Sequence, residues 1–234
     1  MKNRRVSSKH NQISIGTEKF TDPFKINAAV EVFKKRLQKQ PEDINYLYEL
    51  GYFYYLQGNL KKSISTFEKL LKIKPDFALA HYNLGLSYFR SAQLKKAIRS
   101  LHRVVEIDSE FTMAYYWLGL INYRAGYTHQ AIESLLNSLK RDPQSLITLY
   151  DLAIIYLTIA ENKQAIKVLQ KLLNLYPDHG AAYYHLGKAF YNLERYHEAL
   201  FNFNKALELN PHDKKAKQIV DLITEFTRYP EGPI

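Results

Sequence analysis

The chain has 234 residues, of which 46% are hydrophobic and 24% charged, an ordinary globular composition that excludes a disordered protein. It has no cysteine, which excludes disulfide bonds, cysteine-based metal sites and a cysteine nucleophile. No apolar run follows the basic start of the chain, and no stretch approaches the roughly 18 apolar residues of a membrane span. We therefore expect a soluble protein of the cytoplasm or another reducing compartment.

The first predicted elements are an arm and a helix. Residues 1–11 carry four lysines and arginines and no acid, within a formal net charge of +10. We expect residues 1–21 to form a flexible basic arm. Asp22 suits an N-cap and Pro23 the first position of a helix, so residues 22–41 are predicted to hold a leading helix over about residues 24–39.

Five segments of 34 residues follow, and each repeats the same columns of residues. One column reads Leu50-Gly51, Leu84-Gly85, Leu118-Gly119, Leu152-Ala153 and Leu186-Gly187. A second holds Pro41, Pro75, Pro143, Pro177 and Pro211, with Ser109 in the gap. The others hold Ala97, Ala131, Ala165 and Ala199, and Phe67, Leu101, Leu135, Leu169 and Phe203. The predicted units are residues 44–77, 78–111, 112–145, 146–179 and 180–213.

Each unit has the pattern of two helices joined by a short polar break, such as Gln57-Gly58-Asn59. The in-phase proline ends the second helix, because it disfavours helical geometry in the residue before it. One helix pair cannot bury its apolar face alone, so neighbouring units must stack into a continuous core. Residues 214–227, apolar on one face, are predicted as a capping helix, and residues 228–234 as a flexible tail.

These columns resemble the signature of the tetratricopeptide repeat (TPR) family over residues 44–213. Ser63 in place of alanine and Asn122 in place of an aromatic residue are mild departures. The resemblance implies an all-α fold, a right-handed solenoid of antiparallel helix pairs with a leading helix and a C-terminal capping helix. It also implies that the first helix of each unit lines a concave groove with its positions 2, 5, 6, 9, 12 and 13.

Carried over to this chain, the resemblance predicts a groove rich in tyrosine and apolar side chains. The candidate residues are Tyr48, Tyr52, Tyr55, Tyr82, Asn83, Leu86, Phe89, Arg90, Met113, Tyr116, Trp117, Leu120, Tyr123, Arg124, Tyr150, Ile154 and Tyr184. The same positions also hold Leu79, Ile147, Asp151 and His185. Two interpretations of the tyrosines at positions 5 and 12 stay open: packing between units, or contact with a partner.

Position 9 favours partner binding. The family usually places a polar residue there, whereas four of the five residues in this chain are apolar or aromatic: Tyr52, Leu86, Leu120, Ile154 and Lys188, of which only Lys188 is polar. A solvated face has no folding need for such side chains, and exposed apolar patches mark binding surfaces. We expect one concavity, open to solvent, to hold Leu86, Trp117, Leu120 and Tyr123. Leu120 should face away from the helix-pair core.

An extended or helical peptide with several apolar side chains suits this groove. Asn83 would bond the backbone of the ligand, and Arg90 and Arg124 would pair with acids at its edge. Co-chaperone members of the family grip an acidic C-terminus with two lysines, an arginine and two asparagines. Only Asn83 matches that clamp, so carboxylate recognition of this kind is excluded.

The sequence contains no phosphate-binding loop, dinucleotide fingerprint, zinc-protease motif or nucleophile elbow. Its eight histidines are scattered, and His185 is alone on the groove face. We expect no enzyme, no cofactor and no metal site.

The leading functional hypothesis is a protein–protein scaffold, adaptor or assembly factor that binds an apolar peptide or helix of a partner. One alternative is binding of nucleic acid or an acidic surface through basic second helices of the first two units, which carry Lys61, Lys62, Lys95 and Lys96. The aromatic residues lie on the opposite side, which weakens this alternative. A third hypothesis is self-association through the groove, which would give a homo-oligomer.

Overall fold

The structure is a computed structural model that describes residues 22–228. The predicted basic arm, and the predicted tail beyond Arg228, lie outside the described residues. Within residues 22–228 the chain forms twelve helices and no strand. The helices are α1 (Pro23–Lys39), α2 (Ile44–Leu56), α3 (Leu60–Ile73), α4 (Ala78–Arg90), α5 (Leu94–Ile107), α6 (Thr112–Arg124), α7 (Thr128–Arg141), α8 (Leu146–Thr158), α9 (Asn162–Leu175), α10 (Gly180–Tyr191), α11 (Tyr196–Leu209) and α12 (Lys214–Arg228). The predicted all-α class, with a leading and a capping helix, is confirmed.

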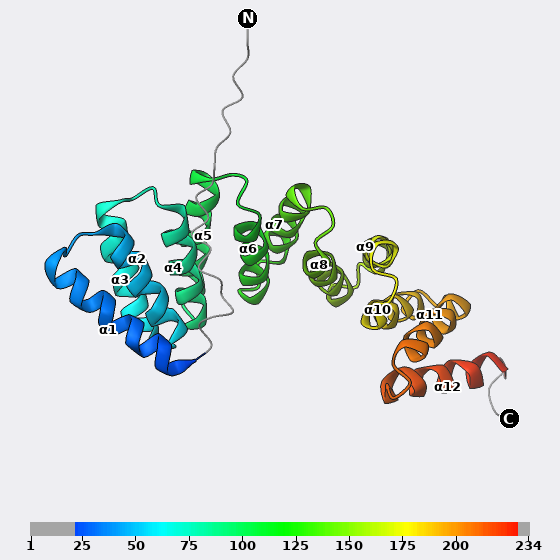
Figure 1. The fold of residues 1–234 in the computed structure, drawn as a ribbon. Coiled ribbons are helices and arrows are strands. Elements are labelled where there is room, and N and C mark those ends of the chain that lie inside the picture. Colours follow the sequence, from blue (N-terminus) through cyan, green and yellow to red (C-terminus); the bar gives the residue numbers. More distant parts are fainter. Residues whose placement is uncertain (1–21, 229–234) are drawn as a thin grey trace, which may run out of the picture. The chain divides into compact units, whose positions relative to one another are not determined.

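The chain divides into two compact units. The first ends at Ser91 and contains α1–α4, and the second begins at Ala92 and contains α5–α12 (Figure 1). The division falls between the two helices of the predicted segment 78–111. Each unit is described below by itself.

In the first unit, α1 begins as its sequence predicts. The carboxylate of Asp22 accepts a hydrogen bond from the backbone N–H of Phe24 at 2.9 Å, and Pro23 occupies the first turn. Ile26 and Val30 of α1 are buried with Leu50 and Phe53 of α2. The leading helix therefore covers the apolar side of the first helix pair.

Ser63 shows how a polar residue occupies the close contact between α2 and α3. Its hydroxyl is fully buried and donates to the carbonyl oxygen of Gly51 at 2.9 Å. It also forms a 2.9 Å hydrogen bond with the hydroxyl of Ser87 on α4. Because both groups are satisfied, serine replaces the usual alanine without an unpaired buried donor.

The turns between paired helices share a left-handed residue at the same place in every repeat. This residue is Gly58, Ala92, Gly126, Ala160 or Glu194, with φ between 59° and 83°. The N–H of the next residue bonds back to a carbonyl near the end of the first helix, as in Asn59 to Tyr54 and Glu161 to Tyr156, both at 2.9 Å. This is a Schellman ending, which suits glycine best.

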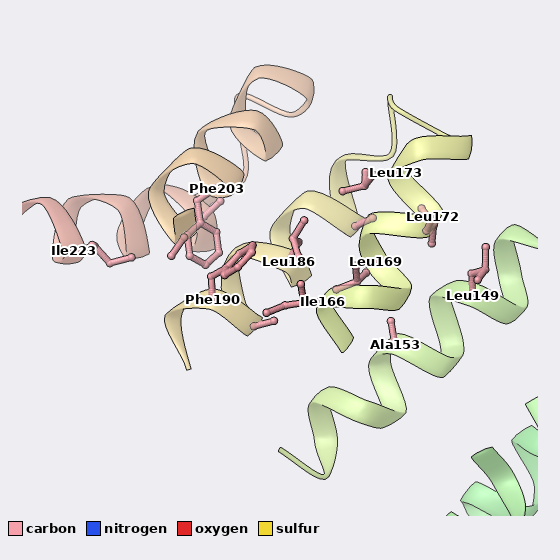
Figure 2. Close-up of a cluster of buried hydrophobic side chains, with 14 residues drawn as sticks. Leu149, Ala153, Ile166, Leu169, Leu172, Leu173, Leu186, Phe190, Phe203 and Ile223 are labelled. Carbon is pink, nitrogen blue, oxygen red and sulfur yellow. The ribbon is translucent and has the colours of Figure 1, made fainter. Parts of the chain in front are cut away.

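The core of the second unit is continuous across its C-terminal half. Leu149 and Ala153 of α8, Leu169 of α9 and Phe203 of α11 belong to one buried cluster that also includes residues of α10 and α12 (Figure 2). Within α12, Ile223 is 1% exposed. The capping helix thus closes the open end of this cluster, and it reaches Arg228, one residue beyond its predicted end. None of the helices in residues 22–228 has the length and apolar character needed to cross a membrane.

Candidate functional site

In each unit, the first-helix face comprises the predicted groove positions on its first helices, which are α2 and α4 in the first unit and α6, α8 and α10 in the second. Its most exposed apolar residues in the second unit are Met113 on α6 and Ile147 on α8, which are 44% and 49% exposed. They occupy the same position in successive repeats. Partly exposed candidates are Tyr48, Tyr52, Tyr55, Tyr82, Phe89, Trp117, Leu120, Tyr123, Tyr150, Ile154 and Tyr184, and Arg90 and Arg124 are exposed.

Three predicted residues are instead buried: Asn83, Leu86 and Tyr116. The expectation that Leu86 is open to solvent is wrong, because only 8% of it is exposed. The amide nitrogen of Asn83 donates to the hydroxyl of Tyr48 at 3.0 Å and to the carbonyl oxygen of Leu79 at 3.1 Å. Its donors are therefore already used inside the first unit.

Leu120 also differs from its prediction. With Trp117 and Tyr123 it packs against a buried cluster that contains Tyr116 of α6 and Leu152 of α8. It therefore does not face away from the core. The physical reason is that α6 is apolar on most of its circumference, so residues outside its main buried face still contact the next repeat.

The tyrosines at position 5 join successive first helices. Tyr48 of α2 meets Asn83 of α4, and the hydroxyl of Tyr116 on α6 donates to Oδ2 of Asp151 on α8 at 2.9 Å. The ring of Tyr150 on α8 meets that of His185 on α10, with centroids 5.7 Å apart. Each of these contacts spans 35 residues, and we call the set the tyrosine ladder. These tyrosines thus pack between repeats.

Arg90 is part of a similar contact in the first unit. Its Nη1 donates to the carbonyl oxygen of Tyr55 at 2.9 Å, and its guanidinium lies 4.6 Å from the centroid of the Tyr55 ring. A ligand acid would have to compete with this arrangement. The contact with Tyr55 therefore competes with the expected pairing between Arg90 and an acid of the ligand.

Burial changes the acid–base properties of the ladder. Burial raises the pKa of Tyr48 to about 12 and also raises the pKa values of Tyr150 and Asp151. Burial, aided by the charge of Lys188 and by His179, lowers the pKa of His185 from 6.5 to about 4. Its Nδ1 is buried and, within the described residues, has no hydrogen-bond partner. His185 is therefore neutral at physiological pH. Among residues 22–228, no three His, Asp or Glu side chains gather as potential metal ligands.

A hollow of about 660 Å³ lies on the other side of the second unit, where α7, α8 and α9 meet. Ile132, Leu136 and Val168 line it, and the lysines at its edge are Lys140, Lys167 and Lys171. Leu136 is 42% exposed. The prediction missed this surface, although the adjacent pair Leu135-Leu136 was a usable signal, since neighbouring residues point about 100° apart on a helix and Leu135 occupies the buried column.

Helix pairs repeated along the chain, with contacts between successive first helices inside each unit, define a helical-repeat protein. Family models described as TPR or tetratricopeptide repeat match residues 51–91, 82–145, 123–189 and 180–213. The chain belongs to the tetratricopeptide repeat family.

Solved structures with the same architecture include MamA, which is 26% identical, with a TM-score of 0.69 over 75% of this chain and 96% of that one. YrrB, described as a TPR protein with an unusual peptide-binding site, is 18% identical, with a TM-score of 0.71 over 81% of this chain and 98% of its own. The C-terminal part of a TPR protein from Cytophaga hutchinsonii is 19% identical, with a TM-score of 0.76 over 88% and 82% of the two chains. A comparison with curated proteins finds no match.

Proposed function

We propose that this protein is an interaction scaffold whose first-helix face in the second unit binds a peptide or helix of a partner protein through apolar side chains. Membership of the TPR family and the likeness to peptide-binding YrrB support a scaffold. The observation that carries the proposed binding mode is the exposure of Met113 and Ile147 at equivalent positions of α6 and α8.

Burying this face would supply affinity. Each Å² of apolar surface removed from water contributes about 25 cal/mol. Trp117 follows Met113 by four residues on α6, so the two share one face of that helix, and aromatic side chains of this kind anchor interfaces. After the entropic losses of association, a few such contacts are enough for micromolar binding.

The test is a selection of peptides from a random 12-residue display library on the full chain, followed by binding measurements with the selected peptides. We expect selected peptides to share apolar residues, and Ile147→Asp to weaken their binding at least about thirtyfold, as a hot-spot loss of about 2 kcal/mol does. Leu136→Asp is the matched control, because it changes a similarly exposed apolar residue in the hollow on the other side. Binding that survives Ile147→Asp would contradict the proposal.

The hollow between α7 and α9 is a second candidate. Its apolar lining and the lysines at its edge suit a peptide that combines apolar and acidic residues. In the same experiment this surface is identified if Leu136→Asp, and not Ile147→Asp, abolishes binding. If the hollow is the binding surface, the selected peptides should be rich in Asp and Glu.

The basic-surface hypothesis has its own control. Lys61 and Lys62 on α3 and Lys95 and Lys96 on α5 are all exposed. If the first-helix face carries binding, changing these four lysines to glutamate leaves the affinity for the selected peptides within about threefold. Tight binding of single-stranded nucleic acid by the wild-type chain, lost in this variant and steeply dependent on salt, would favour the alternative.

A further inference from the structure

One carboxylate interrupts the apolar stripe of α8. Asp151 follows Ile147 by four residues and precedes Ile154 by three, so all three side chains lie on one face of the helix. Ile147 is largely exposed, whereas Asp151 and Ile154 are each part-buried. A bound apolar peptide would therefore cover a carboxylate together with two isoleucines.

This carboxylate has no cationic partner among the described residues. Its one hydrogen-bond contact there is the hydroxyl of Tyr116, which donates to Oδ2 at 2.9 Å. Burial raises the pKa of Asp151, and the only opposing influence is that same hydroxyl, with no contribution from Lys, Arg or His. A carboxylate that loses more water to a bound ligand requires a compensating positive charge.

The surroundings of Asp151 favour a particular cation. Tyr116, its hydrogen-bond donor, lies in edge contact with Trp117, with ring centroids 5.7 Å apart, and Tyr150 precedes it on α8. Aromatic faces attract cations, and the planar, weakly hydrated guanidinium group of arginine both stacks on rings and pairs with carboxylates. Lysine holds its water more strongly and gains less at a part-buried site.

We propose that Asp151 is a specificity residue that pairs with an arginine side chain of the bound peptide, set between apolar residues that contact Ile147 and Ile154. This inference rests on the proposed function, because it requires a peptide on the first-helix face. It reverses the carboxylate clamp of the co-chaperone TPR proteins, since the charge supplied by the scaffold is negative.

The first unit also has a part-buried acid at this position of the repeat. Glu49 occupies on α2 the position that Asp151 occupies on α8, is part-buried, and has its pKa raised by burial alone. Tyr48 precedes it and Tyr52 follows by three residues, so it too is a carboxylate among aromatic side chains. A part-buried acid at this position therefore occurs in both units of a chain whose net charge is +10.

The test repeats the peptide selection with wild-type protein and with Asp151→Asn. Asparagine keeps the shape of the side chain and an oxygen that accepts from Tyr116, but removes the charge. We expect wild type to select peptides with arginine between apolar positions, and Asp151→Asn to select the apolar positions without arginine. Glu225→Gln, at an exposed residue of α12, is the matched control and should select as wild type does.

The interaction between Asp151 and the peptide arginine is then measured with one selected peptide and its Arg→Gln version, each bound to wild type and to Asp151→Asn. The substitution should weaken binding to wild type about tenfold or more, and to Asp151→Asn by less than about threefold. Trp117, the single tryptophan of the chain, reports binding by fluorescence. If Asp151→Asn unfolds, the same two peptides are compared on Asp151→Ser, which also removes the charge.

The outcomes separate the two proposals. If no peptide is selected, or Ile147→Asp leaves binding intact, the proposed function is wrong. If peptides bind through Ile147 but show no arginine enrichment, or if the Arg→Gln peptide loses the same affinity with both proteins, the role of Asp151 is wrong and the proposed function stands. Enrichment of lysine to the same degree as arginine would overturn the preference for a guanidinium group.

Discussion

Position 5 is tyrosine in every repeat, yet the residue that it meets in the next repeat differs each time the structure records the contact. Tyr48 accepts from an amide, Tyr116 donates to a carboxylate, and Tyr150 offers its ring to an imidazole. The constant repeat length thus places a residue opposite each of these tyrosines, and this residue carries an amide, a carboxylate or an imidazole. Tyrosine suits this site because its ring packs while its hydroxyl still finds a partner.

His185 makes folding stability depend on pH. Since its pKa is about 4 in the folded chain and about 6.5 when unfolded, the unfolded chain takes up a proton first as the pH falls. Stability contributed by neutral His185 is therefore lost between pH 6.5 and 4. Because the ring keeps some contact with solvent, we expect a loss of about 1–2 kcal/mol.

The measurement is urea unfolding at about pH 7.5 and about pH 4.5 for wild type and His185→Gln, which cannot titrate there. Between the higher and the lower pH, the free energy of unfolding of wild type should fall by about 1–2 kcal/mol more than that of the variant. Lys188→Gln, which removes a neighbouring positive charge, should raise the pKa of His185 in an NMR titration. Parallel losses in wild type and His185→Gln would contradict the buried, neutral state of this residue.

Ala160 carries local strain in the turn between α8 and α9. Its φ of 60° is left-handed, a conformation that costs an L-residue with a side chain roughly 1–2 kcal/mol and glycine almost nothing. We expect Ala160→Gly to stabilise the second unit by about 0.5–1 kcal/mol, after the greater flexibility of glycine in the unfolded chain is subtracted. Unfolding in urea, followed by Trp117 fluorescence, measures the change.

Lys167→Gly is the control for that experiment. Lys167 is exposed within α9, where glycine should cost about 1 kcal/mol. We expect Ala160→Gly to raise the free energy of unfolding and Lys167→Gly to lower it. If Ala160→Gly also destabilises the protein, the turn conformation is not strained.

The residue-scale predictions failed where helices are apolar all round. The patterns of α4 and α6, ALAHYNLGLSYFR and TMAYYWLGLINYR, offer no polar face that would identify the exposed side. Leu86 was therefore assigned to solvent and is buried, and Leu120 was assigned away from the core and packs on it. Met113 and Ile147, near the start of α6 and α8, are by contrast exposed.

At the scale of elements, close helix contact was predictable from the small residues in the columns. A methyl group added to Gly119 of α6 would lie 2.5 Å from Cγ of Leu135 on α7, far inside van der Waals contact. Helix propensity alone favours alanine by about 1 kcal/mol. We expect Gly119→Ala nevertheless to destabilise the second unit by about 1–3 kcal/mol, because the packed leucine must move.

Ala153 provides the comparison, since it fills the same position on α8 and is fully buried. Ala153→Gly should lose about 1–2 kcal/mol from its methyl contacts and from helix propensity. Both substitutions are measured by urea unfolding of the full chain. A Gly119→Ala variant as stable as wild type would show that Leu135 adapts and that the contact does not require glycine.

Helix boundaries followed from local signals, whereas surfaces between helices did not. The proline column and the turn residues mark where each second helix ends, so the helices lie close to where they were expected. The hollow beside Leu136 depends instead on how far α7 and α9 separate, which no single-helix pattern specifies.

For the whole molecule, the division at Ser91 and Ala92 predicts unfolding that is not two-state. Stability in a repeat array is a sum of local terms, because each repeat contacts only its neighbours. Trp117 lies in the second unit and reports on its own surroundings, while circular dichroism reports on all helices. We expect the urea transitions from these two signals to differ in midpoint.

The variant Phe53→Ala tests separately whether the first unit unfolds independently of the second. Phe53 is buried in the cluster of the first unit, so the truncation should cost that unit about 3–5 kcal/mol. The early part of the circular dichroism transition should move to lower urea, and the Trp117 transition should stay where it is. Coincident transitions that move together would show that both units unfold as one body.

The tyrosine ladder also bears on how such a chain changes during evolution. The repeats share one length and one tyrosine position, so removal of one whole repeat would keep the others in register. Deleting residues 146–179 in frame would preserve every column, yet it would bring Tyr116 opposite His185 instead of Asp151. The tyrosine would then lose its carboxylate acceptor and face a neutral imidazole. The repeats are thus alike in form but not interchangeable, because each recorded tyrosine contact has a different partner in the following repeat.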